Sequence, residues 1–305
     1  MVAIVALEGS LGAEVRGWQP DRDLTEQEKV QLLDALDTRL VLVLRGHPKP
    51  TDGQIARLAH GFGDVFSTGD SYGVAMPHPD VLQVSNELGP DGYEVGVAGS
   101  GVLPWHTDYS FLATPARETL LEAFVLPSSG GPATYFCDMY AAWEALPDNT
   151  QRELSDRVAT HMAMASASYL STGDAGDDPD AAARAERRNP RVRLPGGGGP
   201  ARHPLVVRHP RTGRRALYVS EFIAGIDGME DDDAHRLAVD LLAHAATPER
   251  IYRHDWGLGD LLVFDTIGTV HRRDLSHHGE VRTMRQLSTM ALGLNGPEIS
   301  ALAAP

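Results

Sequence analysis

A short segment of the chain, Trp105-His106-Thr107-Asp108, contains residue types that can bind a metal ion. In an extended segment, residues two positions apart point to the same side. His106 and Asp108 can therefore present an imidazole nitrogen and a carboxylate oxygen to one ion. A His-x-Asp triplet alone is weak evidence for a metal site, because such triplets often arise by chance in a chain with 13 histidines.

A further candidate ligand, His271, lies shortly after the apolar segment 259–265. This segment is typical of a buried strand, which would deliver the histidine near its end. Two histidines and one carboxylate on one side of a metal form the ligand set of non-haem Fe(II) oxygenases, which leave positions open for a cosubstrate and O2. Taken alone, His271 is better explained as a hydrogen-bonded histidine at the end of a strand than as a metal ligand.

A third feature is an arginine that follows His271 in the sequence. Arg282 lies eleven residues beyond His271, which leaves room for a turn and a return strand. Its guanidinium could hold a carboxylate through two parallel hydrogen bonds. The alternative is a surface arginine in a basic stretch that also contains Arg272, Arg273 and Arg285.

Taken together, these residues resemble the taurine dioxygenase family of Fe(II)- and 2-oxoglutarate-dependent oxygenases. The resemblance covers roughly residues 35–292, and its motifs occur in the expected order. They are Trp105-His106-Thr107-Asp108 with Phe111, the segments 131–139 and 141–147, His203-Pro204 with His209-Pro210 and Arg214, residues 216–219, Trp256 with Gly259-Asp260-Leu261, Asp265, His271-Arg272, and Arg282 with Met284.

The resemblance implies a mostly β fold with helices, in which a double-stranded β-helix (jelly-roll, cupin-like) forms the core of a single oxygenase domain spanning residues 1–305. It implies Fe(II), 2-oxoglutarate and O2 as cofactor and cosubstrates, and succinate and CO2 as products beside the oxidised substrate. His106, Asp108 and His271 correspond to the iron ligands. Thr134 and Arg282 correspond to the pair that binds the far carboxylate of 2-oxoglutarate.

Two departures from the family pattern bear on the turn before Thr134 and on the substrate. Gly131-Pro132-Ala133-Thr134 stands where members often have Gly-Gly-Asp-Thr, so the turn must differ. Members that act on sulfonates or carboxylates commonly have a second arginine four residues after the cosubstrate arginine, and here that position is Gln286. Arg285 beside it points to the opposite face of a strand. We therefore expect a substrate other than taurine, such as an amino-acid-derived compound or a secondary metabolite.

The substrate residues are less well defined than the iron ligands. The family places substrate contacts in the loop-rich stretch 67–101, and some members have an aromatic residue beside the iron at the position of Phe264. The candidates are Tyr72, His78, Asn86, Tyr93, Tyr109, Phe264 and Gln286, each of which could equally be a packing or solvated residue. An aspartate at 108 argues against halogenation, since related halogenases have a small residue there. Hydroxylation is expected, with desaturation or oxidative cleavage as alternatives.

Two other functions need to be considered. A zinc hydrolase would use histidine and aspartate ligands to activate water, but it gives Thr134 and Arg282 no role. A non-catalytic protein that binds metal or 2-oxoglutarate on a degenerate oxygenase scaffold would usually have lost a ligand, whereas all three are present here.

The elements that must position these residues are mainly strands in the second half of the chain. Helical patterns are expected at 25–36, where Thr25 and Glu28 form a capping box, and at 52–62, 140–146, 149–159 and 231–244. Strands are expected at 2–15, 40–44, 81–84, 119–126, 133–136, 205–208, 216–219, 259–265 and 285–292. This mixture favours an antiparallel β-sandwich or barrel decorated by helices.

The composition of the chain limits which classes of partner it can bind. The chain has 305 residues and a formal net charge of -15, which argues against nucleic acid. Its single cysteine, Cys137, suits a reducing compartment. No signal peptide or membrane-spanning segment is evident, so we expect a cytoplasmic enzyme that acts on a small molecule, with a homodimer or homotetramer suggested by the resemblance. The low-complexity stretch 173–200 predicts a mobile loop or lid at about 170–202.

Overall fold

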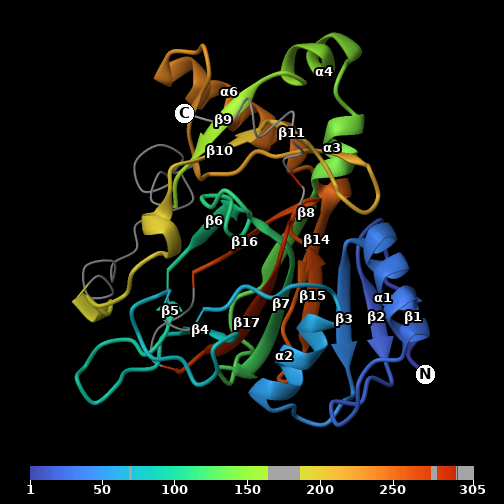
Figure 1. The fold of residues 1–305 in the computed structure, drawn as a ribbon, viewed down its shortest axis with the longest axis vertical. Helices are drawn as coiled ribbons and strands as arrows, with labels where there is room; N and C mark the ends of the chain where they lie inside the picture. The colour runs from blue at the N-terminus through green and yellow to red at the C-terminus, as the bar shows by residue number, and fades with distance from the viewer. Residues whose placement is uncertain (69–70, 100, 164–185, 276–279, 293, 295–305) are drawn as a thin grey trace.

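The computed structural model describes the chain except for residues 69–70, 100, 164–185, 276–279, 293 and 295–305. Two sheets dominate the described part (Figure 1). Among the described residues, the large sheet contains, in order, β1 (Ala3–Ala6), β2 (Ala13–Arg16), β3 (Val41–Arg45), β15 (Leu261–Asp265), β7 (Ala116–Val125), β17 (Thr283–Met290), β4 (Leu82–Ser85) and β5 (Val97–Ala98). The small sheet contains β14 (Ile251–His254), β8 (Thr134–Asp138), β16 (Thr269–Arg273) and β6 (Leu103–His106).

From β4 onward the chain passes back and forth between the two sheets. β4, β7, β15 and β17 belong to the large sheet, and β6, β8, β14 and β16 belong to the small sheet. Within each of these two groups, neighbouring strands are antiparallel. This is the connectivity of a double-stranded β-helix, so the predicted fold class is confirmed.

The strand β15 shows how the sheets and helices pack. Every residue of β15 is buried, because successive side chains point to opposite faces and both faces are covered. Leu261 and Val263 pack in one apolar cluster with residues of α1 (Glu26–Arg39) and α2 (Asp52–His60). Phe264 faces the small sheet, where its ring centroid lies 4.9 Å from that of Phe136. The interior between the sheets is therefore apolar.

The described helices form at sequence signals that are mostly local. The capping box of Thr25 and Glu28 begins α1 as predicted. At the other end of the molecule, α3 (Met139–Glu144), α4 (Asp148–Leu154) and α6 (Asp231–Ala245) pack beyond the small sheet (Figure 1). The helix expected at 149–159 was too long: it ends at Leu154, and Val158 already begins β9 (Val158–His161), which pairs with β10 (Ala201–Pro204) and β13 (Ile223–Ile226).

The strand expected at 2–15 was also wrong in its extent. It is a hairpin of β1 and β2, and the chain reverses where Gly9 and Gly12 adopt φ values of 92° and 86°. Glycine adopts such positive φ angles without a Cβ clash. The strands predicted at 205–208 and 216–219 are present as β11 (Val206–Arg208) and β12 (Arg215–Leu217), which pair as a hairpin.

About half of the predicted loop or lid at 170–202 lies outside the described residues, which resume at residue 186. Its described part includes a short 3-10 helix, η2 (Pro195–Gly198), and the beginning of β10. No helix in the described parts of the chain is long and apolar enough to cross a membrane.

Candidate active site

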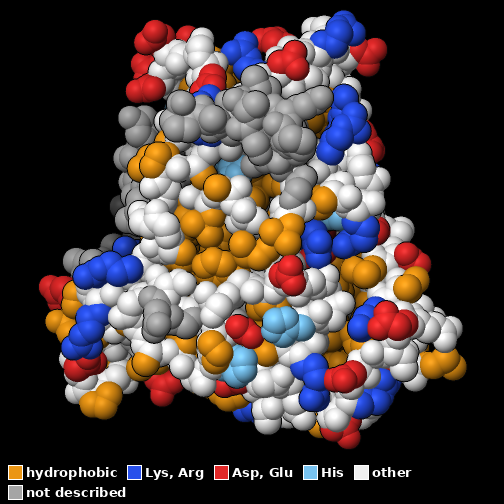
Figure 2. All heavy atoms as spheres, in the orientation of Figure 1, with side chains coloured by type: hydrophobic (Ala, Val, Ile, Leu, Met, Phe, Trp, Pro, Cys, Tyr) orange, Lys and Arg blue, Asp and Glu red, His pale blue; other side chains and the backbone are white. Residues whose placement is uncertain are grey.

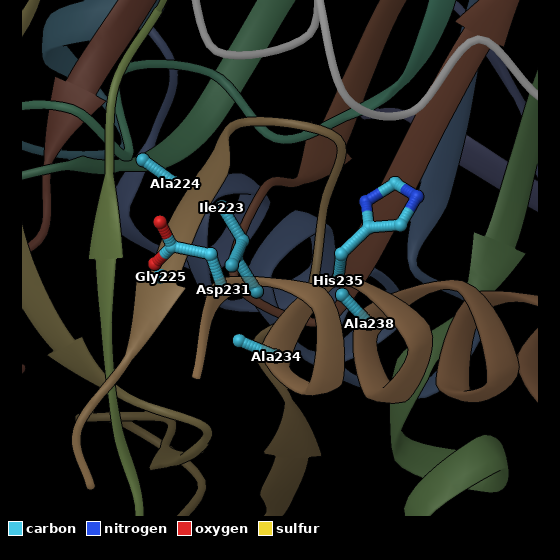
Figure 3. A pocket seen from close by; sticks show the side chains of 7 residues that line it. All are labelled: Ile223, Ala224, Gly225, Asp231, Ala234, His235 and Ala238. Atoms are coloured by element: carbon cyan, nitrogen blue, oxygen red, sulfur yellow. The ribbon is translucent and has the colours of Figure 1, made fainter. Parts of the chain in front are cut away.

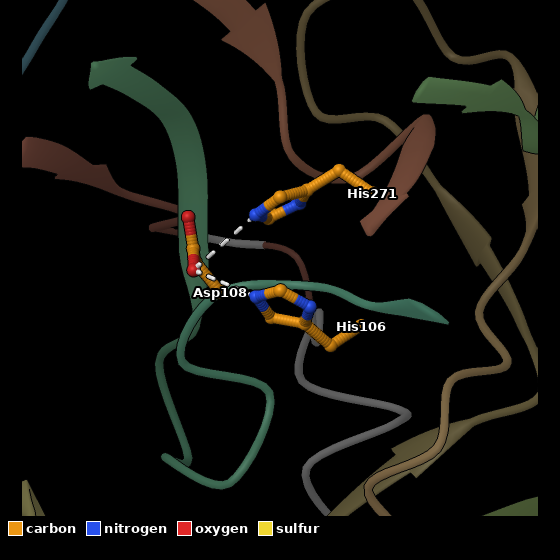
Figure 4. Close-up of side chains that lie close together, drawn as sticks. All are labelled: His106, Asp108 and His271. Carbon is orange, nitrogen blue, oxygen red and sulfur yellow. Dashed lines mark ion pairs between the residues drawn. The ribbon is translucent and has the colours of Figure 1, made fainter. Parts of the chain in front are cut away.

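The three predicted metal ligands lie together at one end of the small sheet (Figure 4). His106 is the last residue of β6, and His271 lies opposite it on the antiparallel neighbour β16. Their ring centroids are 4.1 Å apart. Asp108, just beyond β6, places Oδ1 at 3.9 Å from His106 Nε2 and 4.0 Å from His271 Nε2.

This donor set fits a transition-metal ion. The three ligand atoms lie within 4.8 Å of one another. Imidazole nitrogens and carboxylate oxygens bind such ions at about 2.0–2.2 Å, so two ligand atoms of one ion lie at most about 4.4 Å apart. The two histidine–aspartate distances meet this limit. Two imidazoles and one carboxylate suit Fe(II) and leave positions for a cosubstrate.

Hydrogen bonds orient two of the ligands. His106 Nδ1 lies 2.7 Å from the carbonyl oxygen of Pro104, and donation there leaves the Nε2 lone pair facing the other ligands. Asp108 Oδ2 accepts hydrogen bonds from Thr119 Oγ1 and Gln286 Nε2, which leaves Oδ1 toward the histidines. Burial lowers the pKa of His271, and the nearby His106 lowers it further, so His271 is neutral as a metal ligand must be.

The predicted cosubstrate pair lines the same cavity as the metal ligands. Thr134 begins β8, and Arg282 directly precedes β17. The Arg282 side chain is buried, its Nε has no hydrogen-bond partner, and no carboxylate of the described residues pairs with it. Burial lowers the pKa of Arg282 to about 9, and the charge of Arg273 acts in the same direction. A buried guanidinium without an anion is unfavourable, so its surroundings fit a carboxylate ligand.

The turn before Thr134 contains two consecutive glycines. Gly130 and Gly131 both have positive φ angles, 86° and 80°. A Cβ on Gly131 would lie 3.5 Å from Arg282 Cδ. The two glycines thus form the turn that brings this loop beside the Arg282 side chain.

A cavity of about 790 Å³ joins these residues. Its wall is mostly apolar and includes Phe111, Phe222 and Met284. Hydrophobic side chains also gather over β6 and β16 on the face shown in Figure 2. A separate hollow between β13 and α6 measures only about 10 Å³ (Figure 3), room for about one water molecule.

The predicted substrate residues divide into two groups. Tyr72, Tyr109, Phe264 and Gln286 line the cavity. Tyr72 Oη donates to Tyr109 Oη at 3.0 Å, and the Phe264 ring centroid lies 5.0 Å from that of His271.

The other group does not line the cavity. His78 Nδ1 accepts a hydrogen bond from the backbone of Asp80. Asn86 Oδ1 accepts a hydrogen bond from the backbone nitrogen of Arg282 at 2.8 Å, so Asn86 holds the segment that carries the predicted cosubstrate arginine. Tyr93 also lies outside the described cavity wall.

Sequence reasoning missed some residues of the cavity, notably Glu221, Phe222 and Arg273. For Arg273, the sequence did contain a signal. Arg273 lies two residues after His271 on the same strand, so both side chains point to the same face of the small sheet. Glu221 and Phe222 lie in a connection between strands and had no comparable pattern.

Several known proteins are similar to this chain over most of its length. Residues 3–288 match the family described as "Taurine catabolism dioxygenase TauD, TfdA family". Pentalenolactone F synthase of Streptomyces arenae is 36% identical over 288 residues, which cover 94% of each chain. The alpha-ketoglutarate-dependent 2,4-dichlorophenoxyacetate dioxygenase of Cupriavidus pinatubonensis is 33% identical over 85% of this chain and 87% of its own. The crystal structure of AAD-2 in complex with Mn(II) and N-oxalylglycine superimposes with a TM-score of 0.76 at 30% identity, covering 96% of this chain and 98% of AAD-2.

Proposed function

The chain belongs to the TauD/TfdA family and is an Fe(II)- and 2-oxoglutarate-dependent dioxygenase, and from this premise we propose that His106, Asp108 and His271 bind its iron. Thr134 and Arg282 bind the distal carboxylate of 2-oxoglutarate. The observation that carries this proposal is the convergence of the three ligand atoms in a cavity that also contains a buried arginine without a carboxylate partner. Membership in a dioxygenase family argues against the zinc hydrolase and the non-catalytic binding protein.

The bound iron and 2-oxoglutarate supply the activation of O2 and the oxidising power, with release of succinate and CO2. The residues of this chain hold the metal and the cosubstrate and orient them in the cavity. His106 and His271 present imidazole nitrogens, and Asp108 presents a carboxylate whose second oxygen is fixed by Thr119 and Gln286. Arg282 fixes one end of the cosubstrate in a desolvated pocket, where a charge-assisted hydrogen bond is stronger than in water. The apolar wall excludes water and holds a substrate C–H bond near the metal.

The substrate is a small molecule with a substantial apolar part. The cavity of about 790 Å³ is in the range that binds drug-sized ligands, and the wall that remains beside the proposed iron and 2-oxoglutarate positions is mostly apolar. The relative that acts on 2,4-dichlorophenoxyacetate supports a substrate with a ring. A secondary metabolite or an amino-acid-derived compound meets this description. The reaction is hydroxylation of a C–H bond, and desaturation or oxidative cleavage would use the same ligands.

The test begins without substrate. Fe(II) and 2-oxoglutarate added under anaerobic conditions should produce the weak visible charge-transfer band of an iron–2-oxoglutarate chelate. With O2 and a panel of apolar ring compounds, succinate release should rise above the substrate-free rate for at least one compound. Absence of both the band and succinate would refute the proposal. Light scattering would test the expected homodimer or homotetramer.

A further inference from the structure

The cavity contains a second buried arginine that the proposed chemistry does not use. Arg273 is 4% exposed and lines the cavity. Both hydrogen bonds that its guanidinium makes to described residues come from Nη2, to the carbonyl oxygens of Ala98 at 3.0 Å and Gly101 at 2.6 Å. Its Nε has no partner. Arg273 forms no ion pair with a carboxylate of the described residues, although the buried Glu94 is near enough to favour its charge.

Arg273 lies opposite Thr134 in the register of β16 and β8, but its guanidinium donates to backbone carbonyl oxygens on the β6 side of β16. β16 has β8 on one side and β6 on the other. Thr134 belongs to β8, whereas Ala98 and Gly101, which hold Arg273, come just before β6. Arg273 therefore leans toward the β6 side, where Val97 and Leu103 continue the apolar wall. One carboxylate held by Thr134 and Arg282 would leave Arg273 without an anion.

The cavity-facing residue four positions after Arg282 offers no cation. This residue is Gln286, which donates its amide hydrogen to Asp108. The neighbouring Arg285 donates to Glu122 and Asp52 on the other face of the large sheet. At this part of the cavity β17 therefore supplies an amide, whereas β16 supplies the guanidinium of Arg273.

We propose that Arg273 forms a second anion-binding position in the cavity and binds a carboxylate of the substrate. The substrate class is then an apolar ring compound that carries one carboxylate, with the carboxylate on the β6 side and the apolar part against Phe111 and Phe222. This inference rests on the proposed function, because it assumes that 2-oxoglutarate occupies Thr134 and Arg282. It is compatible with the expectation, drawn from Gln286, that the substrate is not taurine.

The experiment measures equilibrium binding without turnover. The enzyme is loaded with Mn(II) and N-oxalylglycine and titrated calorimetrically with 2,4-dichlorophenoxyacetic acid and with phenyl- and cyclohexyl-substituted acetic acids. Each acid is paired with its primary amide, which has nearly the same shape and no charge. We expect at least one acid to bind at least tenfold more tightly than its amide. R273Q should abolish that preference because it weakens binding of the acid at least tenfold. R273K should restore part of the preference.

Two controls separate this inference from structural damage and from failure of the proposed function. R273Q should bind N-oxalylglycine with an affinity within about twofold of wild type and should unfold at a similar temperature. R282Q, by contrast, should no longer bind N-oxalylglycine. R253Q, an exposed arginine on β14 of the same sheet, should change neither affinity. The inference is overturned if no acid is preferred over its amide, or if R273Q weakens N-oxalylglycine as R282Q does. Failure of wild type to bind N-oxalylglycine would instead refute the proposed function.

Discussion

Gln286 Nε2 lies 3.0 Å from Asp108 Oδ2, the same oxygen that accepts a hydrogen bond from Thr119 Oγ1 at 2.8 Å. Gln286 belongs to β17 of the large sheet, whereas Asp108 follows β6 of the small sheet. The hydrogen bond therefore joins the two sheets at the proposed iron site. Because Oδ2 is held on one side, Oδ1 is the oxygen that faces the two histidines.

The first prediction concerns this contact. Q286L should weaken metal binding about 10- to 100-fold, the range seen when groups that orient metal ligands are removed. Mn(II) or Co(II) affinity, measured by calorimetry without 2-oxoglutarate, gives a readout that is independent of turnover. T119V, which removes the other donor to Oδ2 at nearly constant volume, should act in the same direction. If Q286L binds metal within twofold of wild type, Gln286 does not position Asp108.

The second prediction concerns Arg282. R282Q should raise the concentration of 2-oxoglutarate needed for half-saturation at least tenfold, because a charge-assisted hydrogen bond contributes about 1.5–3 kcal/mol and about 1.4 kcal/mol corresponds to a factor of ten. Initial rates of succinate formation at varied 2-oxoglutarate concentration provide the measurement. N86A should show a smaller effect in the same direction, since Asn86 holds only the Arg282 backbone. A change below threefold for R282Q would remove it from the cosubstrate site.

The third prediction concerns Asp108 itself. D108A should abolish substrate oxidation, because the carboxylate is one of three ligands and its loss leaves two imidazoles. Some 2-oxoglutarate binding should persist, since Thr134 and Arg282 are untouched. Product formation and the anaerobic charge-transfer band test the two statements separately. D255A, which alters an exposed aspartate beside β14, is the matched control. Oxidation by D108A at the wild-type rate would exclude Asp108 from the ligand set.

The clustering of the three proposed iron ligands could be predicted because much of their geometry is local. His106 and Asp108 are two residues apart, so an extended backbone places both on one side whatever the rest of the fold. His271 and Arg282 were tied to them by the order of the family motifs. The capping box of Thr25 and Glu28 was likewise a local signal, and it begins α1 as predicted.

The second set of contacts depends on registers between strands that are far apart in the chain. Gln286 reaches Asp108 only because β17 pairs with β7 in a register that places Gln286 opposite Leu121. A slip of one residue would turn its side chain to the other face. The same holds for Asn86 and Arg282, which are 196 residues apart. Spacing along the sequence carries no information on such registers, so Gln286 was predicted only as a substrate residue.

The last prediction is a pH dependence of stability that arises from Glu221. This carboxylate is buried, lines the cavity and accepts a hydrogen bond from the backbone of Trp105 at 3.2 Å. Burial raises its pKa from 4.5 to about 7, although the bond from Trp105 and the charge of Arg272 oppose the shift. Between these two pH values the folded state binds more protons than the unfolded state. The contribution of Glu221 to stability is therefore greatest at low pH and is lost as pH rises through about 7.

E221Q removes this titration while keeping nearly the same shape. Between pH 6 and pH 8, wild type should lose about 1 kcal/mol more unfolding free energy than E221Q, because about one proton is released from the folded carboxyl over that interval. Urea denaturation at several pH values between these limits measures the difference. All other titrating groups are common to both proteins, so subtracting the two curves isolates Glu221. Parallel curves would mean that this carboxylate titrates near its ordinary pKa, and that the cavity is wetter at Trp105 than its burial indicates.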